Sequence, residues 1–408
     1  NVLADQRYTS ALSFLDDSDV RRRALSLAGR GKVRYRVHRI REALEDLALA
    51  CELARPLEDD KLLANLLLEE ATALDHAMDY EGSLRRAEEA RTITQRMGDP
   101  RLESRVLAAL GRSRWRQQRV GEAIDLLDRA AAAGRAVGEN EARVIALLLL
   151  SSALVIVGQL DEAERRFSEV IALCNEMKDR LHLCSAYANR AYLWTAQNAP
   201  ERGLEDLRRA VEIAREIGNP EPERVATHNL AELLHWCGRE ADALGLARRS
   251  RVLEERFAER AAPDDSLLLA RIQAARGELE EAGRLLSWIA ERCPPSSATP
   301  TVNALYRALK LAVEAHEIEV RGAEENEDSW EAVIADAERD LPVEELLEVL
   351  YWNVRAALWA SSVREAVEAL GKARLRLLEC PMWRPRFDAL TTEVHASSAG
   401  SEAALPPL

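Results

Sequence analysis

Four side chains near residue 110 have the types and the spacing to bind an anion. Arg105, Arg112, Trp115 and Arg116 fall within one expected helix, where three arginines surround a tryptophan on one face. Guanidinium groups bind carboxylates and phosphates through paired hydrogen bonds, and an aromatic ring adds a flat surface for stacking. The cluster therefore predicts a cationic, partly aromatic surface for a carboxylate, a phosphate or an acidic peptide. The alternative is a solvated charged face.

A second candidate cluster consists of two histidines and a glutamate. His228, Glu232 and His235 are spaced i, i+4 and i+7, so they share one face of a helix. Two imidazoles and a carboxylate are ligands for a divalent metal. The histidines, however, lie two turns apart, about 10.5 Å along the axis at ~1.5 Å per residue, which is too far to share one ion without a bend. We therefore expect no metal and no cofactor, and either a ligand contact or an ordinary polar face.

Known catalytic patterns are not matched. The glycine-containing segments 29–31, 31–32 and 111–113 lack the context of a dinucleotide loop, a phosphate-binding loop and a nucleophile elbow, respectively. The six cysteines have no Cys-x-x-Cys spacing and lie mostly at apolar helical positions, which favours reduced core thiols in the cytoplasm. The sequence therefore predicts a protein that is not an enzyme.

The charge balance restricts the partners. A net charge of −14 repels phosphate backbones and anionic lipids, so neither nucleic acid nor a membrane is expected as a partner of the whole chain. The longest apolar run, residues 144–157, is shorter than the roughly 20 residues that a membrane span needs. This run is therefore expected to be a buried helix.

The candidate clusters are part of a chain that repeats itself every 40 residues. Small side chains recur at this interval in two series, seven positions apart. The first series is Ala43, Ser83, Ala123, Ala163, Gly203 and Ala243, and the second is Ala50, Ala90, Ala130, Val170, Ala210 and Ser250. A small side chain at a fixed place allows two helix axes to approach closely. The interval therefore predicts an array of two-helix repeats rather than separate globular domains.

Turn signals recur at the same interval. Gly98, Gly138, Lys178 and Gly218 stand where a helix C-terminus favours left-handed backbone. Asp-Pro follows Gly98 and Asn-Pro follows Gly218, as expected for an N-cap and the first position of the next helix. Each repeat thus consists of a first helix, helix A, and a second helix, helix B, which carries both series of small residues, and these signals mark the end of helix B and the start of the next helix A.

The repeat resembles the tetratricopeptide repeat, whose signature is W-x2-L-G-x2-Y, then A-x3-F, then P. Repeat four reads Leu147-x2-Leu150-Ser151-x2-Leu154, then Ala163-x3-Phe167. The match is good over about residues 20–290 and loose over 300–390. The period is 40 rather than about 34 residues, and HEAT and armadillo repeats, with about 40 to 47, are the alternative. The small residues of helix B favour the tetratricopeptide interpretation, and both imply an α-solenoid.

The resemblance implies an all-α, right-handed α-solenoid of about nine helix hairpins. The expected parts are an N-terminal cap or linker (1–19), a regular array of about seven repeats (20–293), a linker (294–300), irregular C-terminal helical repeats (301–390) and a flexible tail (391–408).

In the tetratricopeptide family, helix A lines a concave groove, and repeat positions 2, 5, 9, 12 and 13 usually face the ligand. Transferred by position, these are the expected partner-binding residues of the concave face: Lys32, Tyr35, Arg36, Arg105, Arg112, Trp115, Arg116, Tyr192, Thr195, His228, Glu232 and His235. The resemblance thus implies a groove that is locally basic in its N-terminal half although the whole chain is acidic.

The implied function is that of a noncatalytic scaffold that captures a protein or peptide segment, including an acidic one, in the concave groove. Long arrays of this kind resemble the sensor or docking regions of bacterial multidomain signalling regulators, a fold-level analogy. The alternative is a small-molecule sensor whose groove closes over a metabolite or nucleotide. A long open groove would favour the peptide, and an enclosed pocket with converging polar groups would favour the small molecule.

Overall fold

The structure is a computed structural model, and it describes all residues except 1, 38, 256–262, 293–298, 322–327 and 399–408. The prediction of an all-α helical repeat protein is confirmed: nine consecutive helix pairs, α2/α3 to α18/α19, lie between α1 and α20, and the described residues include no strand. Among the same residues, no helix has both the length and the apolar character needed to cross a membrane.

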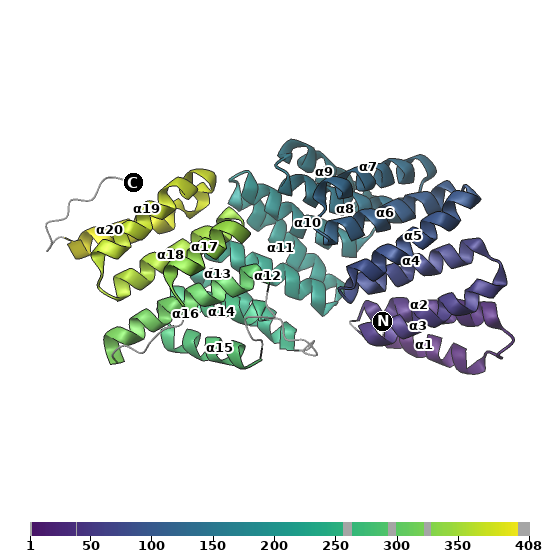
Figure 1. Ribbon diagram of the computed structural model, residues 1–408, viewed down its shortest axis with the longest axis horizontal. Coiled ribbons are helices and arrows are strands. Elements are labelled where there is room, and N and C mark those ends of the chain that lie inside the picture. The colour runs from purple at the N-terminus through teal and green to yellow at the C-terminus, as the bar shows by residue number, and fades with distance from the viewer. Residues whose placement is uncertain (1, 38, 256–262, 293–298, 322–327, 399–408) are drawn as a thin grey trace. The chain divides into compact units, whose positions relative to one another are not determined.

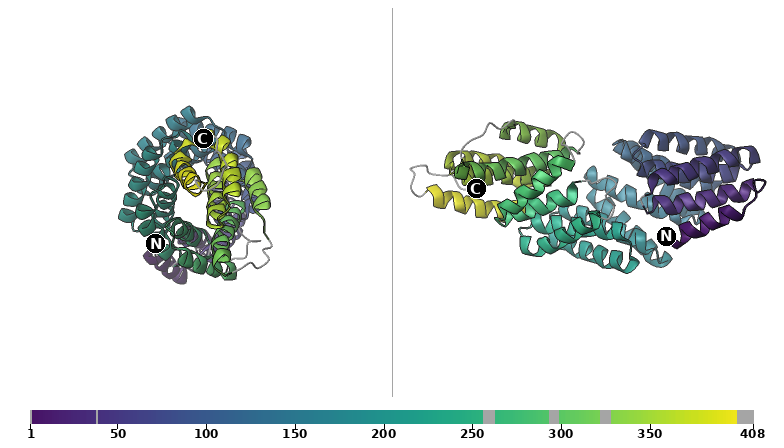
Figure 2. Two further views of the ribbon diagram at one scale, coloured as in Figure 1. Left: turned by 90° about the vertical axis from the view of Figure 1, so that its left-hand side faces the viewer. Right: turned by 90° about the horizontal axis from the view of Figure 1, so that it is seen from below.

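The chain divides into two units, residues 1–193 and 194–408, and each is described by itself. Within each unit the helices lie side by side in antiparallel pairs (Figures 1 and 2). The first unit contains α1 (Val2–Phe14), α2 (Val20–Tyr35), α3 (Ile40–Ala54), α4 (Asp60–His76), α5 (Tyr80–Met97), α6 (Pro100–Arg116), α7 (Val120–Val137), α8 (Asn140–Ile156), α9 (Leu160–Met177) and most of α10 (Arg180–Ala196).

The second unit is less regular, and its helices vary more in length. It contains α11 (Pro200–Ile217), α12 (Pro220–Trp236), α13 (Glu240–Glu254), α14 (Asp264–Ala275), α15 (Leu279–Arg292), α16 (Pro300–Arg321), α17 (Trp330–Asp340), α18 (Val343–Trp359), α19 (Val363–Glu379) and α20 (Arg384–Ser398). Two of the expected boundaries change as a result. Residues 391–398, expected in a flexible tail, belong to α20, and Pro300, expected in a linker, begins α16, while 294–298 lie outside the described residues.

The turn residues end the helices as their spacing predicts. Gly98, Gly138, Lys178 and Gly218 have φ angles of 64°, 68°, 57° and 67°, the left-handed backbone of a helix C-terminus. The next helix begins at once, because the Asp99 carboxylate accepts a hydrogen bond of 2.9 Å from the backbone N–H of Arg101. These sharp turns bring helix B of one repeat into contact with helix A of the next, as for α5 with α6 and α7 with α8.

Close contact between helix A and helix B explains the recurrent small residues. Ala123 and Ala130 of α7 are completely buried. Opposite them, a Cβ atom added to Gly111 of α6 would lie 2.7 Å from side-chain atoms of Leu127, closer than any real Cβ contact. Gly31, two repeats earlier, meets Leu47 in the same way, at 2.8 Å. The two helices can therefore pack at this distance only because one side of the contact has no side chain.

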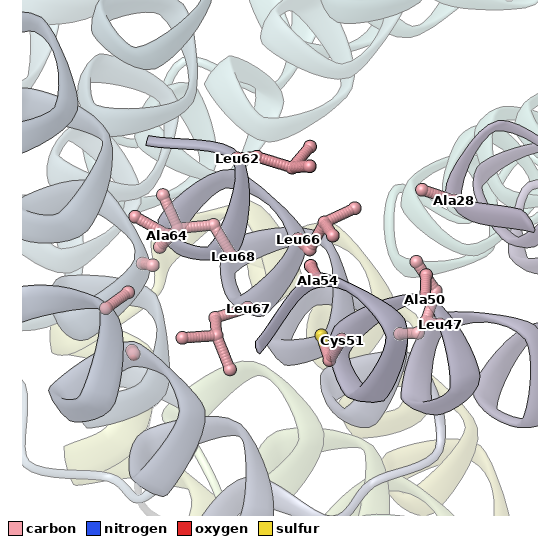
Figure 3. Close-up of a cluster of buried hydrophobic side chains, with 14 of the residues drawn as sticks. Ala28, Leu47, Ala50, Cys51, Ala54, Leu62, Ala64, Leu66, Leu67 and Leu68 are labelled. Carbon is pink, nitrogen blue, oxygen red and sulfur yellow. The ribbon is translucent and has the colours of Figure 1, made fainter. Parts of the chain in front are cut away.

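Alanine and leucine fill the space between the helices of the first unit. Figure 3 shows part of this core, in which Leu47 and Ala50 of α3 and Leu66 and Leu67 of α4 are buried among their neighbours. Burying one leucine contributes about 1.5–3 kcal/mol, so the many contacts of this kind together stabilise the unit.

A buried carboxylate organises the core of the second unit. Glu348 of α18 accepts hydrogen bonds from three side chains of other helices: His235 Nε2 at 3.0 Å, Trp236 Nε1 at 2.9 Å and Arg271 Nε at 2.7 Å. The indole of Trp352, one turn further along α18, donates a fourth at 3.2 Å. A buried carboxylate is tolerated only when it is paired and its lone pairs are satisfied. Glu348 therefore links α12, α14 and α18.

The charges of this cluster set its protonation states. Burial alone would raise the pKa of Glu348, but the charge of Arg271 and the hydrogen bonds from Arg271 and His235 hold it well below its usual range. Burial lowers the pKa of His235, so the ring is neutral at pH 7. Its Nε2–H donates to Glu348, and within the described structure Nδ1 has no hydrogen-bond partner.

His228, two turns earlier on α12, has the opposite behaviour. Its Nδ1 lies 2.8 Å from Oδ1 of Asp265, whose side chain is completely buried. Burial opposes protonation of His228, but the carboxylate outweighs it and raises the pKa of the ring. Arg224 donates a hydrogen bond of 2.6 Å to the same Asp265. One helix thus carries two histidines whose pKa values are shifted in opposite directions.

The close contact at Gly111 can be tested by adding a side chain there. We expect Gly111→Val to lower the stability of the first unit by about 1–3 kcal/mol, because the added atoms overlap Leu127 and force α6 and α7 apart. Thermal unfolding and hydrogen exchange of α6 and α7 measure the effect. Gly121→Ala is the control, because nothing lies within 4 Å of the added Cβ. Equal stability of the two variants would contradict the packing described above.

The two histidines of α12 predict opposite pH dependences. His235 has a lowered pKa, so wild type should lose stability relative to His235→Gln as the pH falls below about 6.5, where the unfolded chain gains the proton. His228 has a raised pKa, so its contribution is complete below about pH 6.5 and is lost at higher pH, relative to His228→Gln. Hydrogen exchange in α12, corrected for intrinsic rates, measures both slopes, which are at most about 1.4 kcal/mol per pH unit. Slopes of the same sign would refute the assignment, and His182→Gln in the first unit serves as the control.

Candidate functional site

The candidate site is built on the first helices of the repeats in the first unit. Besides packing against their partners, α2, α4, α6 and α8 pack directly against one another, and we call them the helix-A row. Because the repeats are 40 residues long, equivalent positions of neighbouring helices lie beside each other. Arg112 Nη2 thus donates a hydrogen bond of 2.9 Å to Thr72 Oγ1, 40 residues earlier.

Glu69 of α4 contacts polar side chains of two neighbouring helices, α2 and α6. It accepts hydrogen bonds from Lys32 Nζ at 3.0 Å and from the Tyr35 hydroxyl at 3.1 Å, both on α2. On the other side, Arg105 Nη2 of α6 lies 3.6 Å away, and Nη1 of the same arginine donates to Asn65. Burial and the Glu69 carboxylate raise the pKa of Tyr35, so its phenol keeps the proton that it donates. The structure therefore brings Lys32, Tyr35 and Arg105 together through an acidic residue that the sequence analysis did not select.

Arg112 is held just as firmly. Its Nε donates to Asp75, and its side chain is only 14% exposed. The ring of Tyr35 stacks on His76 with 5.2 Å between centroids, which fixes the neighbouring part of the surface. These contacts make the positions of Arg112 and Tyr35 part of the scaffold, because a ligand would have to replace existing hydrogen bonds to use them.

Two other arginines of the predicted site are free to interact. Arg36 and Arg116 occupy equivalent repeat positions, two repeats apart, and both are exposed. In the described ranges neither guanidinium makes an ion pair. Trp115, next to Arg116, is half-buried. The helix-A row thus combines side chains that are held by the contacts with Glu69 and Asp75, which we call its rigid floor, with two exposed cations.

The character of the row changes at α8. The residue 40 positions after Arg116 is Ile156, whose side chain is 63% exposed, and Ile145 and Leu149 on the same helix are half-buried. Tyr192 of α10, one repeat after Ser152, is 50% exposed. Asn189 Nδ2 of α10 donates to Ser152 Oγ of α8 at 3.3 Å. The hydrogen bonds between neighbouring first helices, which we call the polar ladder, therefore continue past the apolar residues. The sequence analysis missed Ile156, although the 40-residue register of Arg116 identifies it.

Other predicted site residues do not lie on an open surface. Thr195 is 6% exposed and His235 is completely buried, so the expectation that they face a groove is corrected for both. His235 binds Glu348, whereas Glu232 pairs with Arg271 Nη1 at 2.9 Å. His228 binds Asp265. The three residues of the second candidate cluster therefore engage three different partners.

Comparisons with known proteins place the fold. No protein-family model matches the chain, and no curated protein matches its sequence. Solved structures do match: the apo form of RapI has a TM-score of 0.60 at 11% identity, over 93% of this chain and 99% of that chain. A Rap protein complexed with Competence and Sporulation Factor has a TM-score of 0.53 at 15% identity, over 90% and 98%.

A third match connects the fold with the repeat type. A signal-transduction ATPase with numerous domains and a tetratricopeptide repeat sensor, PH0952 from Pyrococcus horikoshii, has a TM-score of 0.54 at 14% identity. The match covers 87% of this chain and 54% of that protein. The arrangement of helix pairs and the repeated small residues agree with this likeness. The chain has the fold of a tetratricopeptide-type helical repeat protein.

Proposed function

We propose that this protein is a noncatalytic scaffold that captures a peptide segment on the helix-A row of its first unit. The observation that carries the proposal is that two exposed arginines, Arg36 and Arg116, which form no ion pair with any described residue, share one repeat position with the exposed aliphatic side chain of Ile156. A peptide with one or more carboxylates and an aliphatic or aromatic side chain complements such a surface.

The rigid floor supports the same proposal. The ion pairs and hydrogen bonds around Glu69 and Asp75 hold the helix-A row in one arrangement, so binding a ligand there would cost little ordering of the scaffold. Affinity would then come from a few exposed anchors. The structural neighbours are compatible with this function, since one Rap protein was solved in complex with Competence and Sporulation Factor.

We further propose that the scaffold serves as the regulatory or docking part of a bacterial signalling protein. Support comes from PH0952, in which a tetratricopeptide repeat sensor belongs to a signal-transduction ATPase and the match to this chain covers 54% of the protein. Peptide binding to the helix-A row would then be the signal that this regulatory part transmits to the rest of the signalling protein.

Charge reversal tests the cationic part of the site. A random heptapeptide library is selected on wild type, and the dissociation constants of the selected peptides are measured by fluorescence anisotropy. We expect acidic peptides with apolar residues, and at least about tenfold weaker binding to the double variant Arg36→Glu/Arg116→Glu, equivalent to about 1.4 kcal/mol. Affinity should also fall as salt is added. Arg112 is unsuitable for this test because its change would also break the contacts with Asp75 and Thr72.

The matched control for charge reversal is the double variant Arg85→Glu/Arg129→Glu. These arginines lie on α5 and α7, and their side chains are 70% and 56% exposed. Wild-type affinity of the control, together with loss of binding in the first variant, supports the proposal. Equal affinity of all three proteins would remove the arginines of the helix-A row from the site.

Removal of an exposed apolar side chain tests the second half of the surface. Ile156→Ser should leave the stability within about 0.5 kcal/mol of wild type, as for most surface changes. It should weaken the selected peptides several-fold, because their apolar residue loses its contact. Leu375→Ser is the control, since Leu375 is 72% exposed on α19 of the other unit. Isothermal titration decides the matter: unchanged affinity of the Ile156 variant would show that peptides bind elsewhere.

A further inference from the structure

A groove in the second unit has features that the peptide site proposed above does not use. It lies between α13 and α15, has α14 as its floor, and has a volume of about 500 Å³, within the usual range of ligand sites. Arg248 and Arg251 of α13 and Arg284 of α15 stand along its sides, and Leu269 and Gln273 of α14 lie at the bottom. The groove is built entirely from described residues.

The repeat register shows what is unusual about Gln273. At the equivalent position two, four and six repeats earlier stand Trp194, Arg114 and Arg34, and each donates to a carboxylate of the following helix. Trp194 Nε1 lies 2.7 Å from Asp206, Arg114 Nε lies 3.2 Å from Glu122, and Arg34 Nη1 lies 2.8 Å from Asp46. A polar side chain at this place is therefore normally satisfied from within its own repeat.

Repeat seven breaks this rule. The position equivalent to Asp46 and Asp206 is Leu285, and the position equivalent to Glu122 is Glu281, which instead pairs with Arg284 at 3.0 Å. Gln273 is 7% exposed, and no described residue gives its Oε1 a hydrogen bond. A buried amide oxygen without a partner costs about 1–3 kcal/mol, so a ligand that donates a hydrogen bond to it would be stabilised.

A second unpaired polar atom lies in the wall of the same groove. Nε of Arg251 is buried and, within the described structure, lacks an acceptor, and Nη2 of the same side chain lies 3.7 Å from the Glu255 carboxylate. The guanidinium is positioned over the ring of Trp288, 5.5 Å from its centroid. Arg248 is exposed close by. The three arginines outnumber the two glutamates that line the groove, so its charge favours an anion.

The ligand must therefore offer an anion, a neighbouring hydrogen-bond donor and an apolar group. Leu269, Leu285 and Val252, which is 47% exposed, provide the apolar wall. We infer that this groove binds the carboxyl-terminal end of a peptide with an aliphatic last residue. The terminal carboxylate binds Arg251 and Arg248, the N–H of the last residue donates to Gln273, and its side chain packs against the leucines. The groove has room for preceding residues as well.

The test uses a defined probe, the acetylated peptide Ala-Ala-Ala-Leu with a free carboxyl terminus, and the same peptide with a terminal amide. Isothermal titration on the full chain should show the acid bound at least about tenfold more tightly than the amide, as expected for loss of a charge-assisted hydrogen bond. The acid should also bind more tightly than N-acetyl-leucine. Equal binding of acid and amide, no binding of the acid at millimolar concentration, or equal binding of N-acetyl-leucine would overturn the inference.

Two variants locate the binding. Gln273→Leu should fold, because leucine occupies the equivalent position in repeats two, four and six, at Leu74, Leu154 and Leu234. It should bind the acid about three- to tenfold more weakly, since one neutral hydrogen bond is lost. Arg251→Met should bind it at least about tenfold more weakly. Wild-type affinity of either variant would contradict the assignment.

Two controls separate this groove from other surfaces. Arg292→Met should bind the acid like wild type, because Arg292 also lies over the Trp288 ring, at 4.8 Å, but does not line the groove. The double variant Arg36→Glu/Arg116→Glu should also bind it like wild type, because those residues belong to the first unit. Loss of binding in this double variant would assign the probe to the helix-A row instead, so the two proposals can fail separately.

Discussion

Close approach of two helices within each repeat is the constraint on which the structure depends. Gly111 and Gly31 leave no room for a Cβ atom against the leucines they face, and the alanines opposite are completely buried. Because this contact recurs every 40 residues, helix A of one repeat lies beside helix A of the next, and their side chains meet in a fixed register. The surface of the first unit is thus determined by the packing beneath it.

This packing also explains which features could be predicted from the sequence. The small residues, the left-handed turns at Gly98 and Gly218 and the division into helix A and helix B are local patterns, and they identify the fold. The arginines of the helix-A row could be selected in the same way. Whether each arginine is paired or exposed could not be predicted, because Arg112 is held by Asp75 from the preceding repeat whereas Arg116 is exposed. Only contacts between repeats distinguish a structural arginine from an available one.

Local sequence patterns do not identify the contacts of a residue whose partner lies far away in the sequence. His235 has the spacing of a groove residue, yet it is buried because Glu348, 113 residues later, provides its partner. Gln273 illustrates the opposite case: the repeat register places a donor opposite a carboxylate here, whereas in repeat seven the carboxylate is replaced by Leu285 and, among the described residues, Oε1 of the Gln273 amide has no donor. Comparing each repeat with the others is therefore more informative than considering its residues alone, since the exceptions are the candidate sites.

The link between His235 and Glu348 has a consequence for how the protein is made. During synthesis, α12 and α14 leave the ribosome before α18, so Trp236 and Arg271 initially lack the carboxylate that binds them in the finished fold. The polar core of the second unit is completed only after residue 348 has emerged, whereas the ladder of the first unit joins neighbouring repeats. The first unit can therefore fold repeat by repeat during synthesis, whereas the second unit cannot complete its polar core until α18 has been synthesised.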